Sequence, residues 1–167
     1  MSIYASVLEM KKLLRNLDGC IDKAVAYAAT KKFDPNVLLQ SRLSPDMFPF
    51  LRQVQATCDQ AKFAASRVSG RDTPSHPDTE QTVDELKKRI AAVIAYLDEF
   101  SEKDFADSDN RSVTTPRWEG KSMTATNYFV QHAQPNFFFH LTTAYAILRH
   151  NGVDVGKRDY LGQMTWR

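Results

Sequence analysis

Three of the four histidines lie in one segment near the end of the chain, HAQPNFFFHLTTAYAILRHNG, residues 132–152. His132 and His140 are eight residues apart, and Asn136 stands four residues from each. On an α-helix, residues four apart lie on the same face, which is the spacing by which one helix offers two ligands to a metal. An imidazole in such a place can bind a metal or move a proton. The amide of Asn136 is a poor ligand for zinc or nickel.

The helical pattern of residues 126–150 places His140 at the edge of a buried face. That face is formed by Phe137, Leu141, Ala144, Ile147 and Leu148. Two interpretations of His140 stay open: a hydrogen-bonded core histidine, or a metal ligand or catalytic base. The place of His132 depends on Pro135, which has no N–H to give to the helix. If the helix continues with a kink, His132 borders the same patch, and if the helix begins at Pro135, His132 lies in a separate segment.

Three earlier segments carry apolar residues at alternating steps of three and four, which is typical of amphipathic helices. The first covers about the first thirty residues and should end before Pro35, because proline disfavours helix in the residue that precedes it. We expect the second to open around Asp46, a plausible N-cap, and to end near Gly70. The third covers residues 83–100, and Thr82-x-x-Glu85 before it has the form of a capping box.

Residues 112–126, SVTTPRWEGKSMTAT, change the pattern to β-branched and aromatic residues around a Glu119–Gly120 turn. We therefore expect a short hairpin or an extended excursion before the last helix. The tail after Gly152 is too short and too rich in glycine for another long element. Its expected anchors on the bundle are Tyr160, Leu161 and Trp166. Its charged residues Lys157, Arg158 and Asp159 either line the mouth of a pocket or form surface ion pairs.

The sequence thus predicts an all-α protein, a four-helix bundle in which residues 1–167 form one domain. Apolar residues make up 43% of the chain and charged residues 25%, which is ordinary for a globular protein. The net charge of +2 gives no case for binding nucleic acid or an acidic membrane. Basic runs such as Lys87–Lys88–Arg89 fit the solvated face of a helix.

The remaining reactive side chains predict no second site. Cys20 and Cys58 each lie in a helical pattern, and we expect reduced, buried thiols in a cytoplasmic protein. No signal peptide or membrane-spanning segment is expected. His76 lies in a proline-rich loop, where exposure to solvent explains it.

Four helices, an excursion before the last, and the segment PNFFFHLTTAYAILRHNGVDVGKRDYLG together resemble the DinB-like superfamily, named after a damage-inducible protein. Within it, the segment is similar to one bacterial branch, a domain of unknown function. Superfamily members are mostly regarded as metalloenzymes, and the resemblance implies one histidine ligand from the second helix and an HxxxH pair on the fourth. Here the pair falls on Asn136 and His140, and Gln53 or a neighbour occupies the second-helix position. Of three implied ligands, only His140 remains.

This depleted set favours a metal-free small-molecule-binding or interaction module without a cofactor, whose pocket contains Gln53, Asn136, His140 and His132. The alternative is a metal-dependent hydrolase or thiol transferase that uses His140 as its base or as a ligand of a weakly held zinc or nickel ion. The resemblance also implies a homodimer, for which Phe138 and Phe139 would suit the interface. The expected partners are a second copy and a small molecule, with no nucleic acid and no membrane.

Overall fold

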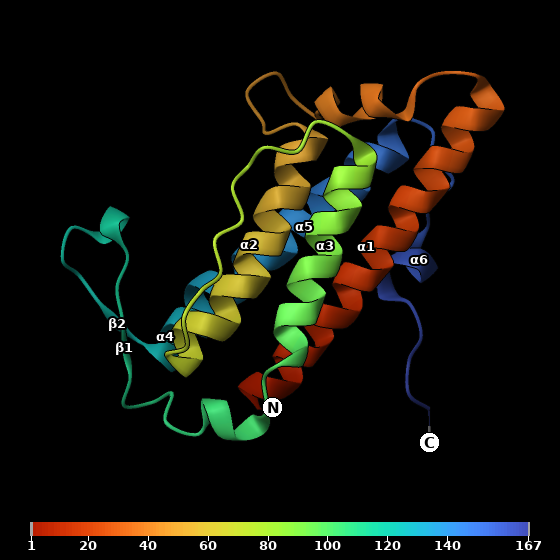
Figure 1. The fold of residues 1–167 in the computed structure, drawn as a ribbon. Helices are drawn as coiled ribbons and strands as arrows, with labels where there is room; N and C mark the ends of the chain where they lie inside the picture. The colour runs from red at the N-terminus through yellow and green to blue at the C-terminus, as the bar shows by residue number, and fades with distance from the viewer. Residues whose placement is uncertain (1, 167) are drawn as a thin grey trace.

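Four long helices pack side by side in the computed structural model, which describes residues 2–166 (Figure 1). They are α1 (Ile3–Lys31), α2 (Phe50–Ser69), α3 (Val83–Asp98) and α5 (Gln134–His150). The all-α four-helix bundle is therefore confirmed. Helices α2 and α3 run parallel to each other and opposite to α1 and α5, because the loop between α2 and α3 returns along the length of the bundle (Figure 1). Within residues 2–166, no helix is long and apolar enough to cross a membrane.

Capping side chains fix the ends of the first and third helices. Ser2 accepts a hydrogen bond from the backbone N–H of Ala5 and so caps α1. The predicted capping box of α3 is confirmed: Thr82 Oγ1 accepts from the N–H of Glu85, and a carboxylate oxygen of Glu85 accepts from the N–H of Thr82. These bonds satisfy N–H groups that a helix N-terminus otherwise leaves unpaired.

The second helix begins later than predicted, and Asp46 is not its N-cap. The helix starts at Phe50, with Pro49 at the N-cap position and no side-chain cap. Two prolines explain the delay, because Pro45 and Pro49 each disfavour the α conformation in the residue before them. Phe48 is thereby left outside the helix, immediately before its first turn.

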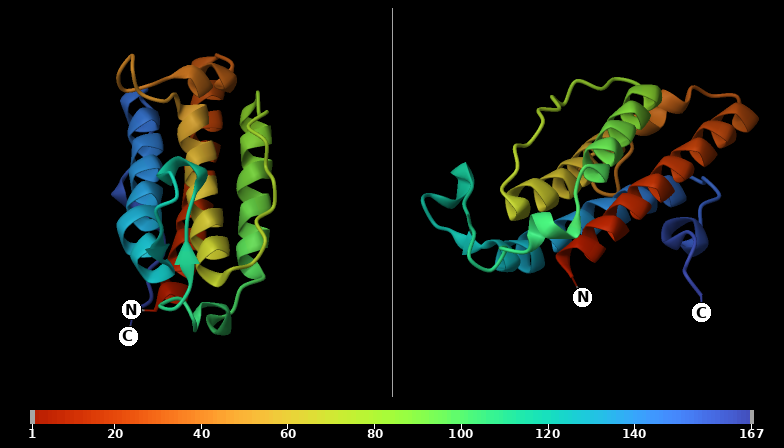
Figure 2. Two further views of the ribbon diagram at one scale, coloured as in Figure 1. Left: turned by 90° about the vertical axis from the view of Figure 1, so that its left-hand side faces the viewer. Right: turned by 60° about the horizontal axis from the view of Figure 1, so that its bottom comes forward.

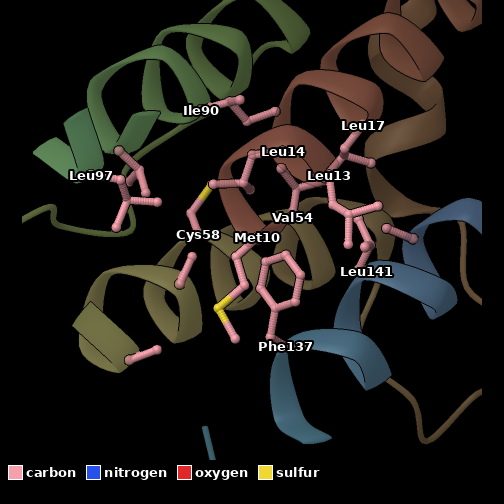
Figure 3. Packing of buried hydrophobic residues seen from close by; sticks show 14 of the residues in the cluster. Met10, Leu13, Leu14, Leu17, Val54, Cys58, Ile90, Leu97, Phe137 and Leu141 are labelled. Carbon is pink, nitrogen blue, oxygen red and sulfur yellow. The ribbon is translucent and has the colours of Figure 1, made fainter. Parts of the chain in front are cut away.

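The hydrophobic core lies between the four helices (Figure 3). It includes Met10, Leu14, Val54, Cys58, Ile90, Leu97, Phe137 and Leu141, each at most 2% exposed. Both cysteines are free and buried, as predicted. Burial raises the pKa of the Cys20 thiol to about 11 and that of Cys58 to about 12, so both are held as neutral thiols.

The predicted hairpin forms between residues 112 and 124. Strands β1 (Ser112–Val113) and β2 (Met123–Thr124) are antiparallel, with Ser112 opposite Thr124. A short 3₁₀ turn, η3 (Pro116–Trp118), lies at the tip and leads into a turn at Glu119 and Gly120, both with positive φ. Two other 3₁₀ turns, η1 (Pro35–Gln40) and η2 (Glu102–Phe105), connect helices elsewhere.

The last helix continues through Pro135 by changing its hydrogen-bond register. A short α4 (Ala125–Tyr128) leads into a π-helical turn, η4 (Phe129–Ala133), and then directly into α5. The N–H of Gln134 bonds to the carbonyl of Phe129, five residues earlier. Pro135 is in the first turn of α5, where its missing N–H costs no hydrogen bond.

The tail folds back on α1 through a further short helix, α6 (Lys157–Leu161). Asp159 accepts from the N–H of Gly156 and pairs with Lys23 of α1 at 2.7 Å, so this carboxylate fixes the tail. Tyr160 packs edge-on against Tyr145, as expected of an anchor. Trp166 is 79% exposed, so its predicted role as an anchor is wrong. Leu161 lies at the surface as well.

We predict that Gly152→Ala destabilises the fold by about 1–2 kcal/mol, because this glycine ends α5 with φ +88°. A Cβ there would also lie 2.7 Å from the hydroxyl of Tyr27. Urea unfolding measures the effect. The matched control is Gly19→Ala, inside α1 with open space around it, which should stabilise by roughly 0.5–1 kcal/mol. Equal responses at the two positions would contradict the prediction.

Candidate functional site

Gln53 and His140 meet across the interface between α2 and α5. The Nδ1 atom of His140 lies 2.8 Å from Oε1 of Gln53. The amide nitrogen of Gln53 donates to the carbonyl of Phe48, so the oxygen of the same amide faces the histidine. Because a carbonyl oxygen only accepts, Nδ1 of His140 must carry the proton. The neutral ring then keeps a free lone pair on Nε2, the atom available to a ligand or a substrate.

The surroundings of His140 favour its neutral form. Its pKa lies below the ordinary value because of burial and, second, because of the positive charge of Arg52. The His140 ring stacks on the Phe48 ring, with their centroids 6.5 Å apart. The guanidinium carbon of Arg52 lies 5.7 Å from the centroid of the Phe48 ring. A neutral imidazole with its outer nitrogen unprotonated can accept a hydrogen bond or act as a base.

The other two predicted pocket residues lie elsewhere. Asn136 donates from its amide to the carbonyl of His132, so its side chain is bonded to its own helix. His132 stacks on Tyr128 and meets Trp118 edge-on, and its buried Nδ1 has no hydrogen-bond partner within residues 2–166. The π turn explains this placement, since its extra residue rotates everything before Pro135 relative to α5. The patch expected to unite the four residues therefore contains only Gln53 and His140 as direct partners.

A pocket of about 370 Å³ opens beside His140. Its α2 side is formed by Arg52, Ala56, Asp59, Gln60, Phe63 and Arg67. Phe48 and His140 complete one end, and residues 115–117 at the tip of the hairpin close the other. Figure 2 shows the hairpin in front of α2 and α5 when the bundle is seen from that side. We call this cavity the His140 pocket. Its volume is in the range of small-molecule sites.

Charged side chains line the wall of the pocket and continue behind it. Asp59 pairs with Lys62 at 3.1 Å and with Arg89 at 2.9 Å. Arg89 is only 4% exposed and also pairs with Glu80 of the α2–α3 loop at 3.0 Å. The prediction that Lys87–Lys88–Arg89 lies on a solvated face is thus wrong for Arg89. Its charge can be buried because three carboxylates compensate it, those of Asp59, Glu80 and Asp78.

The residues present do not fit the metal site that the superfamily resemblance implies. Gln53 and His140, which occupy two of the implied ligand positions, are hydrogen-bonded to each other. The amide of Asn136, at the third position, is bonded to the helix backbone. Across residues 2–166, no group of three or more histidine, cysteine, aspartate or glutamate side chains could hold a metal ion. A zinc site ordinarily needs three good protein ligands. Only His140 could contribute one here.

Sequence reasoning missed the arginines of the pocket. Arg52, Ala56, Asp59, Phe63 and Arg67 follow one another at steps of four, three, four and four, so they form a second face of α2 beside its apolar one. Two arginines, an aspartate and a phenylalanine at helical spacing on that face were the available signal. Arg117 had no such signal, because only the folded hairpin brings its tip to α2.

Comparisons with known proteins agree with this architecture. The family model described as "Domain of unknown function (DUF1993)" matches residues 3–161. The crystal structure of a DinB family member protein from Shewanella denitrificans is 50% identical in sequence, with a TM-score of 0.93, and the alignment covers 96% of this chain and 92% of that one. No match was found among curated proteins.

We predict that Gln53→Glu raises the pKa of His140 above that of the parent protein. The new carboxylate would accept from Nδ1 and stabilise the imidazolium form. Nuclear magnetic resonance (NMR) titration of the histidine ring protons measures this. Gln131→Glu adds the same charge at an exposed position before α5 and should leave the pKa of His140 unchanged. If Gln53→Glu leaves it unchanged too, the hydrogen bond between Gln53 and His140 is absent in solution.

We predict that His132→Phe stabilises the protein by about 1 kcal/mol at neutral pH, because it removes a buried nitrogen without a partner. Burial, and then Arg67, lowers the pKa of His132 below its ordinary 6.5, so the unfolded chain binds a proton at higher pH than the folded protein. The parent should therefore lose stability as pH falls below 6.5, and the variant's advantage should grow there.

Urea unfolding at neutral and mildly acidic pH gives both quantities. His150→Phe, at the exposed end of α5, is the control for adding an apolar ring without burying it. A His132→Phe protein less stable than its parent at neutral pH would show that the histidine has a partner in solution.

Proposed function

Since this chain belongs to the DUF1993 family, a domain of unknown function with the DinB-family fold, we propose a function from its own site: metal-free binding of a small molecule in the His140 pocket. The observation that carries the proposal is the hydrogen-bond chain from the carbonyl of Phe48 through Gln53 to His140. It occupies the positions that two metal ligands would take and leaves Nε2 of His140 at a pocket of about 370 Å³.

The side chains that line the pocket are suited to binding a small molecule. Nε2 of His140 offers a hydrogen-bond acceptor, and the arginines of the pocket offer N–H donors. A concave site with a small number of placed polar groups is typical of small-molecule binding.

The alternative function is a metal-dependent hydrolase or thiol transferase with His140 as base or ligand. It requires at least two further ligands near His140, and the nearest carboxylate of the pocket, Asp59, is held by Lys62 and Arg89. The oriented Nε2 of His140 would still serve as a base. Metal dependence is the property that separates the two functions.

The predicted homodimer and the cytoplasmic location belong to the proposal as well. Phe139 is 56% exposed, whereas Phe138 packs partly against the core, so only Phe139 presents a full aromatic side chain to a partner. Two free buried thiols suit a reducing compartment.

We predict that untagged protein reconstituted with zinc, nickel or manganese and then dialysed retains less than one metal ion per chain by elemental analysis. His140→Ala should leave that small amount unchanged. Stoichiometric metal that is lost on His140→Ala would establish the metalloenzyme and overturn the proposal.

The same proposal requires that fragments bind when a chelator is present. A library of small fragments of mixed charge is screened by NMR, and binding should shift the side-chain amide of Gln53 and the ring of His140. His140→Ala should weaken such binding, whereas Asn136→Ala should not, because Asn136 bonds to its own helix. A screen with no fragment at these residues would contradict the proposal.

A further inference from the structure

The cationic groups of the His140 pocket outnumber its acidic ones. Three arginines, Arg52, Arg67 and Arg117, line it together with a single carboxylate, that of Asp59. Asp59 is already compensated by Lys62 and Arg89 behind the wall. The pocket therefore has positive charge that its own carboxylate does not neutralise.

Two of the three guanidinium groups have no acidic partner in the described chain. Arg52 pairs with Asp78, which takes up its charge. Arg67 donates to the hydroxyl of Tyr128 and lies 4.1 Å from the centre of the Phe63 ring, with no carboxylate partner within residues 2–166. Arg117 is exposed at the hairpin tip and, over the same residues, forms no ion pair.

The stacking of Arg67 on Phe63 has a structural consequence. The Phe63 ring supports the guanidinium of Arg67. One of its N–H groups bonds to Tyr128, and its other N–H groups can bond to a carboxylate or phosphate. Arg67 comes from the rigid α2 and Arg117 from the hairpin, so an oxyanion between them would bridge the two sides of the pocket.

We infer that the His140 pocket binds a small organic anion, whose carboxylate or phosphate is held by Arg67 and Arg117. The inference rests on the proposed function and gives its ligand a chemical class. Carboxylate and phosphate share the chemistry that the arginines recognise, and the experiment separates them.

The test is an NMR titration of the full chain in the presence of a chelator with matched probes. They are para-hydroxybenzoate, phenyl phosphate, benzoate and the neutral para-hydroxybenzamide. The hydroxybenzoate should bind at least about tenfold more tightly than the amide, because a charge-assisted hydrogen bond is lost with the charge. Tighter binding of phenyl phosphate than of benzoate would assign phosphate as the anion, and the reverse would assign carboxylate.

Variants locate the anion. Arg67→Met and Arg117→Met should each weaken the hydroxybenzoate about tenfold and leave the affinity of the amide nearly unchanged. Arg67→Lys keeps the charge but not the guanidinium geometry, so it should weaken binding less than Arg67→Met, which guards against misfolding of the methionine variant. Arg158→Met on α6 removes an exposed arginine far along the chain and should change nothing.

Two outcomes overturn the inference. In the first, the amide binds as tightly as the hydroxybenzoate and both methionine variants are neutral; the pocket then binds small molecules by apolar contact, and the proposed function survives without the anion. In the second, no anionic probe shifts the side-chain signals of Arg67 or Arg117 at millimolar concentration. In that case the mixed-charge fragment screen decides separately whether the pocket binds any small molecule.

Discussion

The hydrogen bond between Gln53 and His140 is the constraint on which the site depends. Both groups lie in the interface between α2 and α5, where an amide or an imidazole without a partner would be costly. Their pairing satisfies Nδ1 of the ring and Oε1 of the amide together, and the carbonyl of Phe48 accepts a hydrogen bond from the amide nitrogen. The bond therefore fixes the tautomer of His140 and aims its Nε2 at the pocket. A glutamine at this position thus acts as an orienting partner, where a histidine would be a metal ligand.

Pro135 also shapes the site, because it has no N–H to donate to the helix. An uninterrupted α-helix would have carried His132 towards the patch around His140. The π turn at residues 129–133 adds a residue to one turn, so His132 is directed to Tyr128 and Trp118 instead. The same rotation brings Tyr128 within reach of Arg67, whose N–H groups bond to its hydroxyl. One proline thereby separates the two histidines and helps to position an arginine of the pocket.

Local features of the fold could be predicted from the sequence, and features that depend on distant segments could not. Periodicity predicted α1 and α3 because their apolar faces meet one core, and the Thr82–Glu85 capping box is a contact three residues long. Arg89 looked like part of a solvated run because its compensating carboxylates come from α2 and from the loop before α3. The pairing of Gln53 with His140 could be approached only through a family resemblance, since 87 residues separate them.

The buried charges of Arg89 and Lys62 bear on the chemistry of the pocket beyond stability. Removing a carboxylate from water is expensive, and the two cations that contact Asp59 offset that cost. With its charge matched from behind, Asp59 cannot also neutralise Arg67 or Arg117 at the pocket surface. The α2–α3 loop contributes to this arrangement by returning along the bundle, which brings Glu80 and Asp78 to Arg89 (Figure 1). The up–down–down–up order of the helices requires this long return loop. The loop therefore allows α2 to carry Asp59 on its pocket face and still present a net positive surface there.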